Sequence, residues 1–398
     1  MDRPPPNRLE LWAAVAAMAG VQIVVMMAVF GVPVLAPLIA AELGYPPSSI
    51  GLLVGSMCAV AIVSSVWGGR AATRRGSFRV CQICMLAVAL ASALTALGTP
   101  LSLAAAALVL GIAFGPETPA SAFLLGRLSP PQRLPLIFSV RQTGNQIGGM
   151  AASLALPLLV PLVGWRGALL GIAAIALAYL LVLEVGRRHY EPRPPAAADR
   201  AARSSWRESL ALVLRERPLR RLALASLAFS MLQLSINSFL VSHAVIELGL
   251  DLVAAGRLMA IVQGAGLLGR VGWGLVGARW VAPGRLIALL GAAMSAFAAL
   301  LLFLPPGLPA PLLALYGFAL GLCGSGWNGV FLAEVARLAP AGRIGEATGG
   351  VLMFTFLGLV VGPTLFAAIV QWTGSYGVAF AALSVVSLSG VALLAQRR

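Results

Sequence analysis

The chain has 398 residues, of which 60% are hydrophobic and only 10% are charged. A soluble protein of this length needs more charge to cover its surface, so the composition excludes a water-soluble fold. The formal net charge of +15 would suit a nucleic-acid-binding protein, but such a protein gathers its basic residues on one folded face. Here the arginines are scattered over short connectors between apolar runs, which argues against a nucleic-acid partner.

Apolar runs of about twenty residues recur from one end to the other, and a run of this length crosses a bilayer as an α-helix. The first six predicted helices span residues 11–41, 50–68, 80–97, 101–126, 134–163 and 167–186. After a polar stretch, six more span residues 222–246, 252–276, 286–304, 311–336, 347–371 and 378–394. The first run is longer than the roughly 7 to 15 apolar residues of a signal peptide, so we expect it to remain in the mature protein. The predicted fold class is an all-α membrane protein with twelve transmembrane helices.

Most arginines lie in every second connector and in the two termini, whereas the alternate connectors are nearly free of them. Cytoplasmic loops of membrane proteins carry such an excess of basic residues. We therefore expect both termini in the cytoplasm, which an even number of spans also requires. The composition is rich in Arg, Ala and Gly, as in proteins of GC-rich genomes, and we expect the chain in the inner (cytoplasmic) membrane of a bacterium.

The sequence contains an internal repeat. A shift of about 210 residues overlays the pairs Gly111 with Gly321, Arg127 with Arg337, Pro130 with Pro340 and Arg133 with Arg343. Such a repeat is typical of transporters in which two bundles enclose a substrate site near the middle of the membrane. We therefore predict a six-helix bundle over residues 1–186, a cytoplasmic linker over 187–221 and a second six-helix bundle over 222–398.

The connector between the second and third predicted helices carries a recognisable motif. It reads Gly69-Arg-Ala-Ala-Thr-Arg74-Arg-Gly76. This segment resembles the G-x-x-x-D-R-x-G-R-R loop motif of the major facilitator superfamily, and the resemblance extends over essentially the whole chain. Thr73 stands where the family has an acid, and the corresponding segment of the second half, from Gly274 to Arg279, lacks the acid as well. The resemblance implies the fold of this superfamily. It does not imply the cytoplasmic contact that the acid of the loop motif makes in the family, because both halves lack this acid.

Three further segments narrow the resemblance. SVRQTGNQIGG, GWRGAL and WNGVFLAEVARLAP are similar to the branch of the family that holds cyanate-type and other small-anion permeases. The G-x-x-x-G-P signature of drug antiporters is absent from the fifth predicted helix, where Gly149 follows Gly144 and Gly148. The resemblance therefore implies a permease for a small organic or inorganic anion. The alternative is proton-coupled efflux of a hydrophobic, drug-like compound.

Few ionisable residues lie deep inside the predicted helices, and two of them stand out. Glu117 lies near the middle of the fourth helix and Arg141 about two turns into the fifth. An ionisable group inside a bilayer costs roughly 2.5 to 3.5 kcal/mol, so it normally faces a cavity or a partner. These helices are consecutive and antiparallel, so the two side chains can pair. In one interpretation, Arg141 binds an anionic substrate, while Glu117 holds Arg141 in place or exchanges a proton. In the other, the two residues form a structural ion pair.

Neutral polar side chains accompany this pair at similar depth. The candidates are Gln22, Asn145, Gln233, Asn237, Trp327 and Asn328. Each of them either lines the substrate site or forms hydrogen bonds between helices. Helix-breaking residues are expected to interrupt the fourth and tenth predicted helices at one depth, namely Gly115, Pro116 and Pro119 in the fourth and Gly324, Gly326 and Gly329 in the tenth. We expect His243, near the outer end of the seventh helix, to be a packing or gate residue.

Other function classes lack their signatures. The sequence contains no HExxH motif, no recognisable Ser/His/Asp set and no Walker A motif, which argues against an enzyme and against an ATP-driven pump. The four cysteines lie in apolar runs and predict neither a disulfide nor a metal site. The two-half repeat argues against a channel. We predict a monomeric secondary transporter without cofactor or metal, which works by alternating access in the bilayer on a small anionic substrate. Its transport is either coupled to protons or facilitated.

Overall fold

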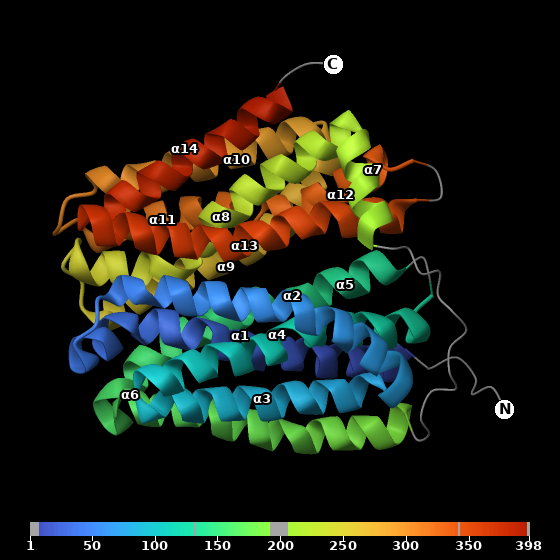
Figure 1. Cartoon of the computed structure of the whole chain (residues 1–398), viewed down its shortest axis with the longest axis horizontal. Coiled ribbons are helices and arrows are strands. Elements are labelled where there is room, and N and C mark those ends of the chain that lie inside the picture. Colours follow the sequence, from blue (N-terminus) through green and yellow to red (C-terminus); the bar gives the residue numbers. More distant parts are fainter. Residues whose placement is uncertain (1–7, 131–132, 192–205, 341–342, 396–398) are drawn as a thin grey trace. The chain divides into compact units, whose positions relative to one another are not determined.

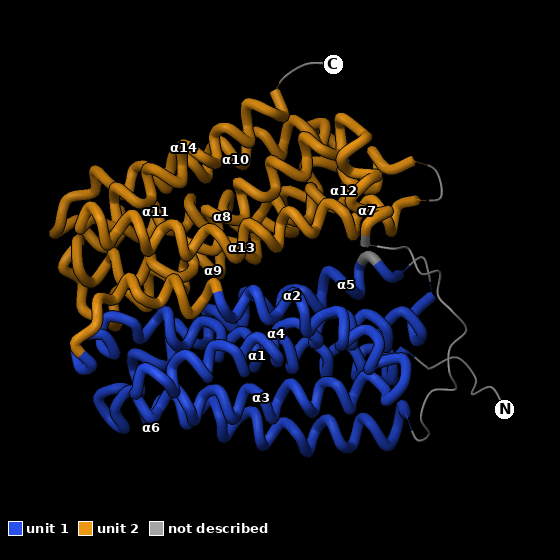
Figure 2. Tube along the Cα trace, in the orientation of Figure 1, with its two compact units in different colours: residues 1–43, 56–201 blue, residues 44–55, 202–398 orange. Residues whose placement is uncertain are grey.

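The computed structural model describes residues 8–130, 133–191, 206–340 and 343–395, and every element in these ranges is a helix (Figure 1). Both chain ends and residues 192–205 of the predicted linker lie outside the described residues. The chain divides into two compact units (Figure 2). The first unit contains α1 and α3–α6 with most of α2, and the second contains the segment Gly44–Gly55 and α7–α14.

The helices of the first half of the chain follow the predicted runs closely. They are α1 (Arg8–Leu43), α2 (Ile50–Arg75), α3 (Ser77–Leu97), α4 (Pro100–Leu128), α5 (Leu134–Gln142) and α6 (Gly144–Tyr190), with a 3-10 turn η1 (Pro47–Ser49) before α2. Helix α6 has 47 residues, or about 70 Å, more than twice the thickness of a bilayer core. It is broken at Gly164, whose φ of 68° lies in the left-handed region, and it therefore holds two spans.

The second unit repeats this arrangement. Its helices are α7 (Trp206–Arg215), α8 (Arg217–Ile246), α9 (Leu252–Arg279), α10 (Pro283–Leu300), the 3-10 turn η3 (Leu301–Phe303), α11 (Ala310–Gly324), α12 (Trp327–Leu338), α13 (Ile344–Thr373) and α14 (Tyr376–Ala395). Eleven helical stretches of the described residues are long and apolar enough to cross a membrane. Because one of these stretches contains the two spans of α6, the prediction of twelve spans is confirmed.

Two predicted details differ from the structure and a third agrees with it. The fifth predicted helix is divided at Thr143 into α5 and the start of α6. The expected interruption of the tenth helix is present, since α11 ends at Gly324 and α12 begins at Trp327. The expected interruption of the fourth helix is wrong, because α4 runs without a break through Pro116 and Pro119.

Close packing explains why α4 stays whole. A β-carbon on Gly115 would lie 2.2 Å from the carbonyl oxygen of Ala61, and one on Gly68 would lie 2.4 Å from the β-carbon of Pro116. The small residues and the proline therefore form the contact surface between α4 and α2, as small residues commonly do between membrane helices. Neighbouring helices support a proline inside a transmembrane helix in this way.

The sequence repeat is also present in the packing. A β-carbon on Gly111 of α4 would lie 2.5 Å from the carbonyl oxygen of Met57 in α2. In the second unit, a β-carbon on Gly321 of α11 would lie 2.1 Å from the carbonyl oxygen of Val262 in α9. The glycines match at the predicted shift of 210 residues, and the residues that they contact match at 205. Equivalent helices thus meet at equivalent glycines in both units.

Candidate functional site

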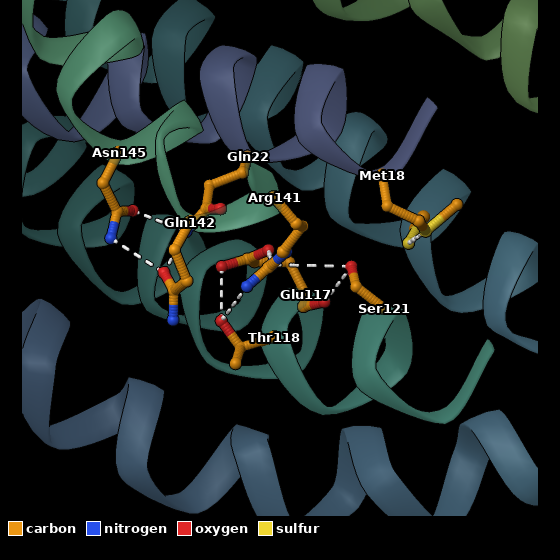
Figure 3. A network of polar contacts seen from close by, with 9 residues as sticks. Met18, Gln22, Glu117, Thr118, Ser121, Arg141, Gln142 and Asn145 are labelled. Carbon is orange, nitrogen blue, oxygen red and sulfur yellow. Dashed lines mark hydrogen bonds and ion pairs between the residues drawn. The ribbon is translucent and has the colours of Figure 1, made fainter. Parts of the chain in front are cut away.

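The centre of the first unit holds a buried ion pair between α4 and α5. The Nη2 atom of Arg141 donates to Oε2 of Glu117, so the predicted pairing is present (Figure 3). The two side chains are only 2% and 1% exposed. Thr118 donates from Oγ1 to Oε1 of Glu117 at 2.7 Å and accepts from Nη1 of Arg141 at 3.3 Å. The pair is therefore bridged by a hydroxyl group as well as joined directly.

Two further features define the surroundings of this pair. Nη2 of Arg141 also lies 3.4 Å from Oγ of Ser121, while Nε of Arg141 is buried without a hydrogen-bond partner among the described residues. Thr118 is exposed, unlike the two charged residues that it bridges. Thr118 is consequently the exposed residue of this cluster.

A neutral amide cluster continues the site along α5 and α6. Nε2 of Gln22 donates to Oδ1 of Asn145 at 2.6 Å and to Oε1 of Gln142 at 3.2 Å, and Nδ2 of Asn145 donates to the same Oε1 at 3.2 Å (Figure 3). Oε1 of Gln22 is buried and has no partner among the described residues. The predicted residues Gln22 and Asn145 are thus brought together. Gln142 also belongs to this cluster and was not predicted from the sequence, although it stands three residues before Asn145, a spacing at which helical side chains meet.

Glycines bring the start of α6 close enough to α1 for these bonds. A β-carbon on Gly144 would lie 2.9 Å from the carbonyl oxygen of Ala19 and 3.1 Å from the β-carbon of Gln22. One on Gly148 would lie 2.5 Å from the carbonyl oxygen of Ile23. The break at Thr143 and the glycines after it therefore let α6 press against α1, which places Asn145 within hydrogen-bonding distance of Gln22.

The second unit contains a smaller polar group at the break between α11 and α12. Nδ2 of Asn328 donates to Oε1 of Gln233 at 3.3 Å and to the carbonyl oxygen of Ser325 at 3.2 Å. Nε2 of Gln233 lies 3.4 Å from Oγ of Ser325. Asn237 is half-buried one turn further along α8, and no hydrogen bond among the described residues joins it to this group. Ser325 was not predicted from the sequence, because its contacts with Gln233 and Asn328 depend on the interruption of the helix between α11 and α12.

Trp327 occupies the position that matches Glu117 at the shift of 210 residues. Its ring is fully buried and meets the rings of Phe229 and Phe331 edge-on, with centroids 5.6 and 5.3 Å apart. The second unit therefore has an aromatic cluster where the first unit has an ion pair. The permanent positive charge of Arg141 has no counterpart at its matching position, Val351.

Comparisons with known proteins identify the family. The family model described as Major Facilitator Superfamily matches residues 18–333. The chain belongs to the major facilitator superfamily. No curated protein sequence is similar enough to this one to count as a match.

Solved structures of transporters have the same fold. A bacterial homologue of the human lysosomal transporter Spinster, in an inward-facing and unoccupied conformation, is 16% identical with a TM-score of 0.70, over 98% of this chain and 95% of that one. The nucleoside transporter NupG is 16% identical with a TM-score of 0.77, over 96% of this chain and 98% of that one. A POT family transporter in complex with 5-aminolevulinic acid is 12% identical with a TM-score of 0.74, over 95% and 94% of the two chains. At such identities the likeness establishes the fold and leaves the substrate open.

Membership of the superfamily determines the general activity. The protein is a multi-pass membrane transporter for small molecules and not an enzyme. The fold supports secondary transport by alternating access, in which two bundles rock around a substrate site.

In this chain a carboxylate from the residue after α6 lies beside the loop motif. Gly76 has a φ of 92°, and a β-carbon there would lie 2.3 Å from Oε2 of Glu191. Glu191 follows α6 and accepts from the main-chain nitrogens of Ser77 at 2.8 Å and Phe78 at 3.1 Å, which caps the first turn of α3. Burial raises the pKa of Glu191 although these N–H groups act in the opposite direction. A carboxylate is therefore present at this turn even though Thr73 replaces the acid of the motif.

The other motif residues surround this turn or its counterpart. Arg74 is exposed, and the hydroxyl of Thr73 donates to the carbonyl oxygen of Arg70 at 2.8 Å. Gly69 is close enough to α4 for a β-carbon there to touch Pro119 at 3.8 Å. In the second unit, Gly274 and Arg279 are both exposed near the end of α9.

A glutamate also joins the first and last membrane helices at the opposite end of each unit. Glu42 in α1 accepts from Nε1 of Trp165 and from Nη1 of Arg166, both at 2.5 Å. Glu247, 205 residues later, accepts from the main-chain nitrogens of Tyr376 at 2.5 Å and Gly377 at 3.0 Å, and lies 2.9 Å from Nδ1 of His243. His243 is thus a buried packing residue that also holds a carboxylate.

Replacement of Glu247 by glutamine is expected to destabilise the protein by about 1 to 2 kcal/mol at pH 7, because the N–H groups at the start of α14 lose a charged acceptor. Burial opposes ionisation of Glu247, but the close contact with His243 and the hydrogen bonds from Tyr376 and Gly377 outweigh it and lower the pKa to about 2 from 4.5. The carboxylate therefore stabilises the fold above pH 4.5 and loses this effect as the pH falls from 4.5 towards 2. Thermal unfolding of both proteins in detergent between pH 2.5 and 7 measures the difference.

The matched control is Glu42→Gln in the first unit, whose ion pair is nearly half exposed and is expected to contribute little. A destabilisation by Glu247→Gln that stays constant between pH 7 and pH 3 would show that the ionised carboxylate is not what stabilises α14.

Proposed function

We propose that this transporter carries a small organic or inorganic anion, and that Arg141 is the group that binds it. The observation that supports this proposal most strongly is the position of a permanently charged guanidinium group in the interior of a membrane-spanning unit, only 2% exposed. Holding such a charge there is expensive, and membrane proteins retain it mainly where it binds a substrate or an ion. The planar fork of arginine matches a carboxylate or a similar oxyanion.

Glu117 occupies the place that a substrate anion would take. Its carboxylate receives both a direct hydrogen bond from Arg141 and one from Thr118. A proton on Glu117 would remove its negative charge and free the guanidinium group for the substrate. Thr118, the exposed member of the cluster, gives an incoming anion its first donor. In this proposal one proton and one anion enter together, which supplies the coupling.

Neutral amides are suited to orienting the anion once it is bound. Asn145 stands at i+4 from Arg141, and its hydrogen bonds to Gln22 and Gln142 fix the amide orientation. In the second unit, Gln233, Asn237 and Asn328 remain the candidates for substrate binding that the sequence predicts. The packing of Trp327 among aromatic rings favours a structural role for its side chain.

The location and organisation of the chain complete the proposal. The alternation of arginine-rich connectors supports both termini in the cytoplasm and an inner bacterial membrane as the site of action. In this proposal the transporter is a monomer in which residues 1–186 form the first bundle, 187–221 the linker and 222–398 the second bundle.

The test measures uptake of labelled small anions, including acetate, lactate, nitrate and cyanate, into proteoliposomes with a pH gradient. The wild-type protein is expected to take up at least one of them saturably. The variant Glu117→Gln/Arg141→Gln keeps the charge balance of the interior but removes the guanidinium group. Its uptake is expected to fall at least about tenfold, as the loss of one hydrogen bond to a charged group predicts.

The matched control is Arg166→Gln, which removes an arginine of the first unit whose ion pair is largely exposed. Uptake by this variant is expected to stay within about twofold of the wild type. Equal uptake by the wild type and the double variant would remove Arg141 from the mechanism. A wild-type protein that extrudes hydrophobic dyes and takes up none of the anions would instead favour drug-like efflux.

A further inference from the structure

The segment between the two halves contains a short amphipathic helix that is docked on the second unit. Helix α7 buries Ser209, Leu212 and Val213, which lie on one face at i, i+3 and i+4. Gly350 of α13 makes the contact possible, since a β-carbon there would lie 2.4 Å from the carbonyl oxygen of Ser209. Gly350 stands six residues after the start of α13, so α7 meets this membrane helix within about 10 Å of its end. Helix α7 therefore lies at the level of a bilayer surface.

The outward face of α7 combines an apolar and a basic residue near its end. Leu214 is 45% exposed, and Arg215 beside it is exposed as well. A helix that lies in a membrane surface presents such a combination, since the apolar side chain reaches the acyl chains and the basic one the headgroups.

Two more exposed arginines follow immediately at the start of α8. Arg217 is the first residue of α8, and Nη1 of Arg220 donates back to the carbonyl oxygen of Leu214 at 2.8 Å. This bond keeps Arg220 over the end of α7, close in the chain to Arg215. We call Arg215, Arg217 and Arg220 the α7–α8 corner.

Among the described residues, the acidic ones nearby form no direct ion pair with this corner. None of the ion pairs within the described ranges involves Arg215, Arg217 or Arg220. The pKa of Arg343 is raised by its hydrogen bonds to Glu346 and, more weakly, by the charges of Glu208 and Glu216. The charges of the two glutamates of the α7 region therefore act on Arg343 at the start of α13 as well.

We propose that the α7–α8 corner binds the headgroups of anionic phospholipids and that this binding holds α7 against α13. Three guanidinium groups at the end of two membrane-associated helices attract a negatively charged lipid surface, and each adds to the attraction. The exposed Leu214 favours a lipid over a soluble anion, because it gains from contact with acyl chains. Anionic lipid would thereby regulate how firmly the linker between the halves is attached to the second unit.

The test is hydrogen exchange of the α7 amides in nanodiscs. In phosphatidylglycerol, exchange across residues 206–215 is expected to be at least about fivefold slower than in phosphatidylcholine. The variant Arg215→Gln/Arg217→Gln/Arg220→Gln is expected to exchange at the phosphatidylcholine rate in both lipids. Exchange in α13 serves as the check that this variant is folded, because all three substituted side chains are exposed.

The matched control is Arg70→Gln/Arg75→Gln/Arg79→Gln, which removes three exposed arginines from the α2–α3 region of the first unit. It is expected to keep the slow exchange of α7 in phosphatidylglycerol. The proposal is overturned if the α7–α8 variant retains the lipid effect, if the control variant loses it, or if phosphatidylcholine protects α7 equally. Full protection by inorganic phosphate in phosphatidylcholine nanodiscs would also overturn it, since the ligand would then be a soluble anion.

Discussion

Replacement of Glu117 by glutamine is expected to lower the stability of the protein by about 3 to 5 kcal/mol, the cost of leaving a buried charge without its partner. Arg141 is only 2% exposed, and Glu117 is the one carboxylate that pairs with it among the described residues. The neutral amide of glutamine accepts a hydrogen bond from Arg141 but does not balance its charge. Unfolding in detergent, followed by the fluorescence of the tryptophans, measures the loss.

The double variant Glu117→Gln/Arg141→Gln separates charge imbalance from lost packing. It is expected to regain most of the stability, because the double substitution leaves no unpaired charge at this position. If the single variant is as stable as the wild type, water or another group already reaches the guanidinium group and the interior is not sealed. The same double variant is used in the transport test, so its stability also establishes that a loss of uptake comes from chemistry and not from misfolding.

The membrane helices could be predicted from the sequence because hydrocarbon imposes one rule on every span. Backbone groups inside a bilayer must bond within the helix, so each apolar run of sufficient length becomes a helix whatever its details. The same reasoning located the boundary between the two spans of α6, since Gly164 follows directly on the end of the predicted run at residue 163. Helix α7 was not predicted, because a ten-residue amphipathic helix carries no such signal and depends on its contact with α13.

The candidate site could be predicted only in part. The scarcity of charge inside the spans singled out Glu117 and Arg141, and their pairing followed from two consecutive antiparallel helices. The roles of Gln142, Ser325 and Glu191 could not be predicted, because each depends on an interruption of a helix or on a partner more than ninety residues away. The error at Pro116 has the same origin, since neighbouring helices and not the local sequence decide whether a proline breaks a membrane helix.

Replacement of Gly321 by alanine is expected to destabilise the protein by about 3 kcal/mol, at the upper end of the range for a methyl group forced into a packed interior. The added carbon would lie 2.1 Å from the carbonyl oxygen of Val262, a main-chain atom that cannot turn aside as a flexible side chain can. Helices α9 and α11 must therefore separate along the contact. Titration with a denaturing detergent, followed by the loss of helical circular dichroism, measures the change.

The control lies in the same unit. Gly272 of α9 has no atom within 4 Å of the place where a β-carbon would stand, so Gly272→Ala is expected to stabilise the protein by roughly 0.5 to 1 kcal/mol through its better helix propensity. Gly111→Ala in the first unit, with its 2.5 Å approach to Met57, is expected to destabilise like Gly321→Ala. A neutral effect of both substitutions would mean that the helix pairs tolerate a wider spacing. If Gly321→Ala and Gly111→Ala both lower the stability and Gly272→Ala does not, the repeated glycines are explained by equivalent close helix contacts, one in each unit.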